Sequence, residues 1–255
     1  MRWIAFTTLF RRECAVIARY WLVTLAPPAI SMALYFGIFG KVLGGRIGTI
    51  VGVPYIEYMA PGLIALTAIP SAFMHSAAGM LGARFIGYIE EVLVAPQPRW
   101  IVLAGYVAGG VMRGLVVASM AALVALLFSG FHGVSPGLTL VAVLLAATIS
   151  ATGGFITGML AKSFERVSMT QGLILVPMAF LGGVFVPVSA LPEWARFVSH
   201  ANPVFYMVSA VRSGIGGAAE APVALSIAVM LVFAAALLLI ALRLVSTREL
   251  RQHGG

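Results

Sequence analysis

Long stretches without charged residues alternate with short charged segments along this chain. The uncharged stretches cover residues 20–40, 58–83, 114–161, 167–192 and 221–242. A helix that crosses a bilayer needs about 20 predominantly apolar residues, so each stretch is long enough for at least one span. The longest stretch is interrupted by a turn-like sequence at 129–136 and therefore holds two spans.

This pattern predicts an all-α integral membrane protein with six transmembrane helices. The part of the longest stretch before the turn, residues 114–128, is too short to cross a bilayer alone, so its helix must extend back through Arg113 toward Trp100. We expect one membrane domain over residues 1–255, with spans at about 20–40, 58–82, 102–128, 136–161, 168–187 and 221–243.

Composition also indicates a body surrounded by lipid. Of the 255 residues, 61% are hydrophobic and 9% are charged, whereas soluble domains carry about 25% charged residues. This excludes a soluble enzyme, a disordered regulator and a disulfide-built secreted domain. Cys14 is the only cysteine and cannot form an intrachain disulfide.

The positive charges predict the orientation, because Lys and Arg accumulate on the cytoplasmic side of membrane proteins. If six spans alternate, one side holds Arg2, Arg11, Arg12, Arg19, Arg84, Arg99, Lys162, Arg166, Arg243, Arg248 and Arg251. The other side holds Lys41, Arg46, Arg196 and Arg212. We therefore expect both termini in the cytoplasm. The net charge of +8 is explained by this orientation, and we expect no nucleic-acid partner.

Residues 1–19 mix arginine with large apolar side chains such as Trp3, Phe6 and Phe10. This mixture favours a helix that lies along the cytoplasmic interface, with its arginines reaching lipid phosphates. The alternative is a basic flank that only sets the orientation.

The sequence lacks the common arrangements of catalytic residues. It contains no Asp, and its four histidines are scattered and form no His-Glu-x-x-His pair for zinc. It also has no Gly-x4-Gly-Lys-Ser/Thr phosphate loop. We therefore expect no enzyme activity and no cofactor in this chain, and ATP-driven work would need a second subunit that binds ATP and Mg²⁺.

The connection between the second and third expected spans, residues 84–99, is more apolar than a solvated loop. Phe85, Ile89 and Val92 recur at helical spacing, and Pro96 and Pro98 stop the helix. Such a short amphipathic helix either docks on a partner or packs against its own chain, and the spacing leaves both interpretations open.

The segment from Phe180 to Gly217 is expected to enter the membrane from the outer side and return. Pro187 ends the fifth span, residues 191–199 read as a short amphipathic helix, and residues 204–211 after Asn202-Pro203 are too few to cross. Irregular backbone at membrane depth must be buried or line a watery cavity, so this region is expected to cap a pathway. The alternative is an ordinary outer loop.

Arg113 is the only charged residue inside an expected span. If the helix starts near Trp100, Arg113 lies about 20 Å along it and faces a partner or the transported substrate. If the helix starts near Gly109, Arg113 reaches the interface. Nearby small-residue pairs, Gly105/Gly109, Gly110/Gly114 and Gly154/Gly158, predict close helix packing.

Several motifs, in order along the chain, carry a resemblance to the permease subunits of ABC-2 type exporters, most closely to the YadH-like inner-membrane permeases of bacteria. They are Leu25-Ala-Pro-Pro, Leu34-Tyr-Phe-Gly-Ile-Phe-Gly40, Pro61-Gly-Leu-Ile, Ile89-Glu-Glu-Val-Leu-Val-Ala-Pro96, Ala104 to Gly114, Leu181-Gly-Gly-Val-Phe-Val-Pro187, Leu191-Pro192, His200-Ala-Asn-Pro203 and Tyr206 to Arg212.

The resemblance implies an interfacial helix at 1–19, a coupling helix at 84–99 and outer re-entrant helices at 188–217. The coupling residues would be Arg84, Tyr88, Glu90, Glu91, Pro96 and Arg99. The outer gate region would include Phe185, Pro187, Leu191, Pro192, Asn202, Pro203, Tyr206 and Arg212. Two permease copies would pair and rest on two copies of an ABC ATP-binding subunit.

The resulting expectation is a homodimeric export permease of the bacterial inner membrane that works by alternating access. Its cargo would be amphipathic: a lipid-like molecule, a drug or a glycan. The rival interpretation is a secondary carrier or channel without an ATPase. A proton relay through the spans is disfavoured, because every Glu lies near or beyond a span end.

Overall fold

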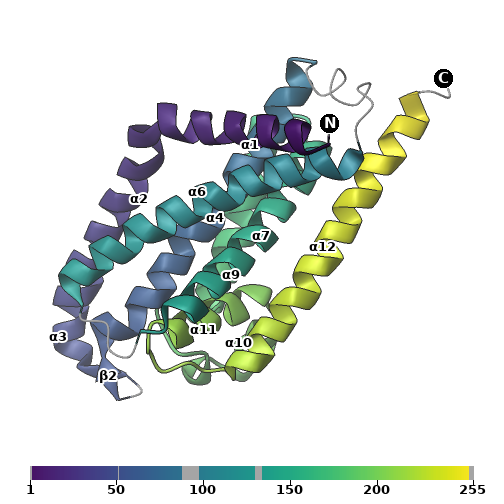
Figure 1. Ribbon diagram of the computed structural model, residues 1–255. Helices are drawn as coiled ribbons and strands as arrows, with labels where there is room; N and C mark the ends of the chain where they lie inside the picture. The colour runs from purple at the N-terminus through teal and green to yellow at the C-terminus, as the bar shows by residue number, and fades with distance from the viewer. Residues whose placement is uncertain (1, 51, 88–97, 130–133, 253–255) are drawn as a thin grey trace.

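The computed structural model describes residues 2–50, 52–87, 98–129 and 134–252. The chain is almost entirely helical in these ranges (Figure 1). The first half contains α1 (Arg2–Arg19), α2 (Trp21–Tyr35), η1 (Phe36–Leu43), α3 (Gly44–Ile47), α4 (Tyr55–Phe85) and α6 (Arg99–Phe128). The second half contains α7 (Pro136–Leu160), α8 (Phe164–Thr170), η2 (Gln171–Leu175), α9 (Val176–Leu181), η3 (Val188–Ala190), α10 (Glu193–Ala201), α11 (Pro203–Gly214) and α12 (Val223–Gln252).

A small antiparallel hairpin, which the sequence pattern did not predict, joins α3 to α4. Its strands are β1 (Thr49–Ile50) and β2 (Val53–Pro54), and Gly52 between them has φ +80°. Only glycine adopts this backbone region at little cost, so Gly52 permits the tight turn.

Helix α4 forms the centre of the bundle, and α6 and α7 pack directly against it. In its most apolar section 61% of the residues are buried, against 17% in the corresponding sections of Trp21–Ile47, which begins with α2, and of α12. Helices α2 and α12 therefore form the outside of the bundle, and Figure 1 shows α12 along one flank.

Close packing of α7 on α4 depends on two glycines of the predicted pairs. A Cβ at Gly154 would collide with the backbone carbonyl of Phe73, and a Cβ at Gly158 would collide with that of Ala77. The helices approach each other backbone to backbone at these points, as small residues allow.

Helix α1 lies across one end of the bundle, which we call the α1 end (Figure 1). Its Leu9 packs on Gly105 of α6, and its Glu13 carboxylate lies 3.0 Å from Nε2 of His75 on α4. Both partners of this pair are about 95% buried. The C-terminal end of α12 lies at the same α1 end, whereas α3, β2 and α10 lie at the opposite end, the α10 end.

Five helical segments in the described part of the chain are long and apolar enough to cross a membrane. They are Trp21–Ile47, Tyr55–Phe85, Trp100–Phe128, Pro136–Leu160 and Val223–Ser246. The span expected at 168–187 is not among them. The helix there consists of α8, η2 and α9, begins beside Glu165 and Arg166, and ends at Leu181, before Pro187. Gly182 and Gly183, the latter at φ +78°, explain this earlier end.

Candidate functional site

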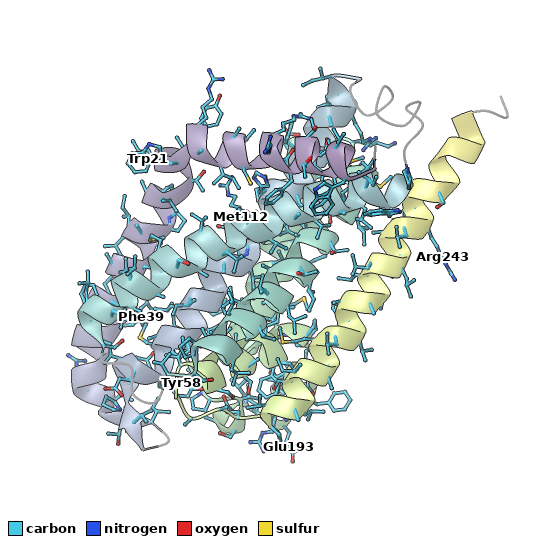
Figure 2. All side chains as sticks on the ribbon, in the orientation of Figure 1. Trp21, Phe39, Tyr58, Met112, Glu193 and Arg243 are labelled. Carbon is cyan, nitrogen blue, oxygen red and sulfur yellow. The ribbon has the colours of Figure 1, made fainter. Side chains whose placement is uncertain are left out.

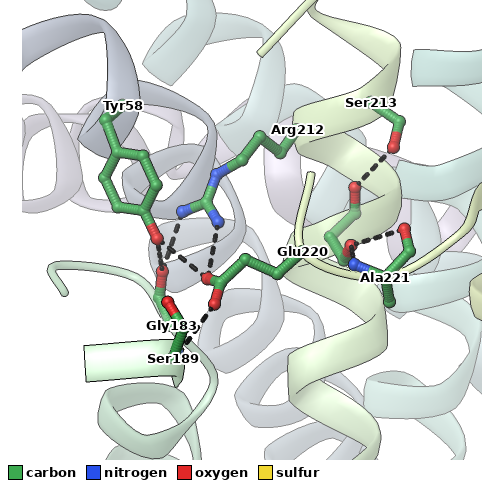
Figure 3. Close-up of polar contacts among 8 residues, drawn as sticks. Tyr58, Gly183, Ser189, Arg212, Ser213, Glu220 and Ala221 are labelled. Atoms are coloured by element: carbon green, nitrogen blue, oxygen red, sulfur yellow. Dashed lines mark hydrogen bonds and ion pairs between the residues drawn. The ribbon is translucent and has the colours of Figure 1, made fainter. Parts of the chain in front are cut away.

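A buried polar cluster at the α10 end connects four separate parts of the chain (Figure 3). Its members are Tyr58 near the start of α4, Gly183 in the loop after α9, Ser189 in η3, Arg212 in α11 and Glu220 before α12. We call these five residues the Arg212 cluster.

Arg212 is the central cation, with 1% of its side chain exposed. Its Nη2 donates to the carbonyl oxygen of Gly183 at 2.8 Å, and its Nη1 lies 3.4 Å from Oε1 of Glu220. The guanidinium carbon lies 4.0 Å from the centroid of the Tyr58 ring. Breaking such a buried pair is costly because the remaining charge stays without its counter-ion. The cluster therefore favours the observed arrangement of α4, the segment from Gly183 to Ser189, α11 and the connection before α12.

Glu220 bridges the remaining members. Its Oε1 accepts a hydrogen bond from the Tyr58 hydroxyl at 2.9 Å, and its Oε2 accepts from the Ser189 backbone N–H at 3.2 Å. The adjacent Ala221 is held by Ser209 of α11, whose hydroxyl accepts from the Ala221 N–H at 3.0 Å. The connection between α11 and α12 is therefore held in place at Glu220 and at Ala221.

The loop between α9 and η3 reaches the cluster because glycine permits a close approach. A Cβ at Gly62 on α4 would lie 2.8 Å from the Val184 carbonyl oxygen. Gly62 belongs to the Pro61-Gly62 motif, so this motif has a packing role: it seats the loop on α4.

The expected outer gate residues are brought together at this end but differ in role. Asn202 caps α11, since its Oδ1 accepts from the Val204 N–H at 2.9 Å and its Nδ2 donates to the Met178 carbonyl at 2.6 Å. Pro203 is the first residue of α11. The Tyr206 hydroxyl donates to the His200 carbonyl at 2.9 Å.

Phe185 joins an aromatic group that connects α2, η1 and α9. Its ring centroid lies 5.9 Å from Tyr35, 5.4 Å from Phe39 and 5.3 Å from Phe180. Leu191 packs beside Val188 and Phe205, Pro187 is buried directly before η3, and Pro192 is exposed at the start of α10.

Sequence reasoning missed Tyr58 and Glu220 as site residues. The sequence pattern indicates only that Tyr58 begins an uncharged stretch and that Glu220 precedes another. The available signal was weak: Glu220 is an acidic residue in a Gly-rich connection, eight positions after Arg212. Nothing in the sequence shows that α4 brings a tyrosine to the same point.

Arg113 lies in the middle of α6, which runs without a break from Arg99 to Phe128. It is therefore about 21 Å from the start of the helix at ~1.5 Å per residue. The side chain is half-buried, and its Nε is buried without a hydrogen-bond partner in the described part of the structure. This is the first of the two placements considered from the sequence.

Most of the expected coupling helix lies outside the described residues, including Tyr88, Glu90, Glu91 and Pro96. Arg99 is the first residue of α6. Arg84, near the end of α4, has Nη1 within hydrogen-bond distance of the carbonyl oxygens of Gly158, Met159 and Ala161, at 2.8–3.0 Å. It thereby satisfies carbonyl groups left open at the end of α7.

Sequence comparison places this architecture in a family. The sequence model of the ABC-2 type transporter family matches residues 4–215. The chain is also 38% identical over 238 residues to the inner membrane transport permease YadH of Escherichia coli K12, which covers 93% of each chain. The chain belongs to the ABC-2 type transporter family.

More distant relatives of this ABC-2 chain carry different functional names. Nodulation protein J of Sinorhizobium fredii is 28% identical over 84% of the chain and 80% of that protein. The daunorubicin resistance ABC transporter permease protein DrrB1 of Streptomyces coeruleorubidus is 26% identical over 75% of the chain and 67% of that protein. YadH and DrrB1 are named as transporter permeases, and the family normally works with an ABC ATP-binding subunit.

In the described part of this ABC-2 chain, no three His, Cys, Asp or Glu side chains gather into a group that could hold a metal ion. The Arg212 Nη atoms, the Glu220 carboxylate and the Tyr58 hydroxyl are instead engaged with one another or with backbone groups, whereas Nε of Arg212 is buried without a hydrogen-bond partner in the described part of the structure. Their arrangement holds helices and loops in place.

Proposed function

We propose that this chain is the membrane-spanning subunit of an ATP-driven exporter in a bacterial inner membrane. The observation that carries the proposal is the family match, which extends over most of the chain and agrees with its bundle of apolar helices. Two copies of this permease pair, and two copies of an ABC ATP-binding subunit supply ATP hydrolysis with Mg²⁺.

The proposed permease crosses the membrane six times, with both termini in the cytoplasm. The helical segment formed by α8, η2 and α9 contains 18 residues and is about 27 Å long at ~1.5 Å per residue. This is close to the thickness of the hydrocarbon core, about 30 Å. The position of α1 and of the end of α12 at one end of the bundle supports an even number of crossings.

The mechanism that we propose is alternating access. ATP binding closes the partner subunits, the segment at 84–99 transmits this movement, and the two permease chains open a path outward. In this proposal the Arg212 cluster keeps the outer end closed; the support is that it connects α4, α11 and the loops around them. Opening requires these segments to separate or to move together.

The proposed cargo is amphipathic: a lipid-like molecule, a drug or a glycan. The support is the low charge of the spans, among which Arg113 is the exception. The names of the relatives, which include nodulation and daunorubicin resistance, agree with a family whose members differ in cargo.

The first test is an affinity pull-down of the tagged chain from native membranes, followed by mass spectrometry. We expect recovery of an ATPase with a phosphate loop, and its loss when Glu90 and Glu91 are both changed to Arg. The matched control is Glu193→Arg, which changes a charge on exposed α10 at the other end and should leave recovery unchanged. A well-folded chain that recovers no ATPase would favour the rival carrier or channel.

A further inference from the structure

The buried side of α1 carries a carboxylate between two apolar side chains. Of the α1 side chains that the structure describes, only Leu9, Glu13 and Ile17 are buried. They recur every four residues and therefore form one stripe along the helix. A helix that only lies at a membrane interface has an apolar stripe and keeps its charged residues on the other face. The buried position of Glu13 therefore needs a second explanation.

Glu13 is received by glycines and a histidine of α4 and α6. A Cβ at Gly109 of α6 would lie 2.6 Å from the Cβ of Glu13, and a Cβ at Gly79 of α4 would lie 3.6 Å from its Oε2. Glycine at position 109 is what lets the two helices approach this closely. The pair Gly105/Gly109, predicted from the sequence to permit close packing, thus admits α1. We call Glu13, His75, Gly79, Gly105 and Gly109 the α1 seat.

His75 of α4 faces the charge of Glu13. Nε2 of His75 lies 3.0 Å from the Glu13 carboxylate, and both side chains are about 95% buried. Nε2 makes no aligned hydrogen bond in the described part of the structure, so the contact is electrostatic. A buried pair of this kind can often be replaced by apolar residues without loss of stability, and its best attested role is to fix one register between helices.

The pair favours one position of α1 along α4 and α6. If α1 shifts by one turn, Leu9 or Ile17 lies against His75, and the Glu13 carboxylate is buried without its partner. Removing one partner of a buried pair is costly, whereas the apolar residues of the stripe can replace one another in their contacts. Glu13 therefore selects the described register from those that an apolar stripe alone would permit.

The α1 seat also connects the first expected span to the second. Helix α1 leads almost directly into α2, which begins at Trp21 (Figure 2) and packs on α6. His75 belongs to α4, which ends at Phe85, where the expected coupling segment 84–99 begins. The seat therefore joins the start of the first span to the helix that leads into that segment.

We propose that Glu13 and His75 are positioning residues that fix α1 in one register on α4 and α6, so that α1 and the adjoining end of α2 follow α4 when it moves. The register stands on the contacts alone. The shared movement rests on the proposed function, because that movement originates at the segment 84–99.

Disulfide formation between α1 and α6 measures the register. A Cβ at Gly105 would lie 2.9 Å from the Cβ of Leu9, and a disulfide needs about 3.8 Å, so a separation of about 1 Å admits the bond. The parent is the purified full-length chain with Leu9→Cys, Gly105→Cys and Cys14→Ser, oxidised by copper–phenanthroline. His75→Leu should slow disulfide formation about tenfold or more, because the carboxylate is then buried alone. The exchanged pair, Glu13→His with His75→Glu, should restore most of the rate.

Replacing both members by Leu separates positioning from stability. The variant with Glu13→Leu and His75→Leu should unfold at the denaturant concentration of the parent, since apolar contacts replace the pair. It should nevertheless form the disulfide about threefold more slowly, because three registers one turn apart then have similar energies. The matched control is Arg11→Gln at an exposed position of α1, which should leave the rate unchanged. A doubly apolar variant that reacts as fast as the parent would overturn the register.

Export from proteoliposomes tests the shared movement, with an amphipathic dye as the probe and the ATP-binding subunit present. His75→Leu should lower export about fivefold at an unchanged rate of ATP hydrolysis, and the disulfide between positions 9 and 105 should restore export because it holds α1 in place of the pair. Unchanged export by His75→Leu would overturn the shared movement. So would loss of export when the disulfide forms in the parent, because α1 would then have to leave α4 and α6 during the cycle. If the parent exports no dye, the proposed function fails together with the shared movement, whereas the disulfide rates still decide the register.

Discussion

Arg212 is the largest side chain that is fully buried in the described part of the molecule. Its charge is compensated by Glu220, by the Gly183 carbonyl and by the face of Tyr58. Removing one member of a buried ion pair costs about 3–5 kcal/mol, whereas replacing both members costs much less. The cluster therefore stabilises the fold only while Arg212 and Glu220 are both present.

This reasoning predicts the outcome of a double-mutant cycle. Arg212→Met and Glu220→Gln should each lower the free energy of unfolding by about 3 kcal/mol. The double variant should fall short of the sum by about 3 kcal/mol, because it leaves no uncompensated buried charge. Denaturant titration in mixed micelles measures these values. Arg46→Met removes an exposed cation at the same end and serves as the control. Additive costs would show that Arg212 and Glu220 do not act as a pair.

Arg113 leads to a prediction about transport, because its half-buried cation lies in the middle of α6. If it contacts cargo, Arg113→Leu should lower the efflux of amphipathic dyes about tenfold, the effect of losing a charged contact of about 1.5–3 kcal/mol. Cells that also express the ATP-binding subunit provide the assay, and Arg113→Lys should retain most of the efflux. Unchanged efflux at normal expression would contradict a role in cargo binding.

At the residue scale, the sequence predicted the region of the site but only part of its chemistry. Arg212, Asn202 and Pro203 were expected at the outer end because they flank a segment too short to span. Tyr58 and Glu220 were not expected, since their role depends on which helices meet in three dimensions. Arg84, expected to contact an ATPase, donates to carbonyl groups at the end of α7 in the structure, and the contact with an ATPase stays a prediction.

At the element scale, charge-free length predicted the helices well because a long apolar stretch has few alternatives in a membrane. It was less accurate at helix ends. The helix before the outer loop ends at Leu181 because of two local glycines, although the apolar pattern continues to Pro187. The hairpin of β1 and β2 was also missed, because two-residue strands leave no detectable alternation.

The interface of α4 and α7 predicts opposite effects for two neighbouring glycines. Gly154→Ala should lower the free energy of unfolding by about 3 kcal/mol, the upper range for overpacking, because its Cβ meets the rigid backbone of Phe73. Gly153→Ala should have little effect or stabilise the helix, since the nearest atom, in the Phe73 ring, is 4.0 Å away. Unfolding of both variants in mixed micelles tests this difference, and similar losses would contradict the described register of the two helices.

At the scale of the whole molecule, the number of crossings determines which groups face the cell exterior. Helices α1 and α10 lie at opposite ends of the bundle (Figure 1). The helix formed by α8, η2 and α9 leads from Glu165 toward the loop before α10. If this helix crosses the membrane, Glu165 and Phe197 of α10 face opposite compartments. If it does not cross, the two residues share one side.

Labelling with a membrane-impermeant maleimide distinguishes these arrangements. The chain has one native cysteine, Cys14, and partial burial together with the neighbouring Glu13 carboxylate raises the pKa of its thiol, which makes it a poor competitor for the reagent. In a Cys14→Ser background, Phe197→Cys should react in intact cells because that side chain is 79% exposed on α10. Glu165→Cys, also at an exposed position, should react only after the inner membrane is permeabilised. Reaction of both positions from the same side would rule out six crossings, and the two chain termini would then lie in different compartments.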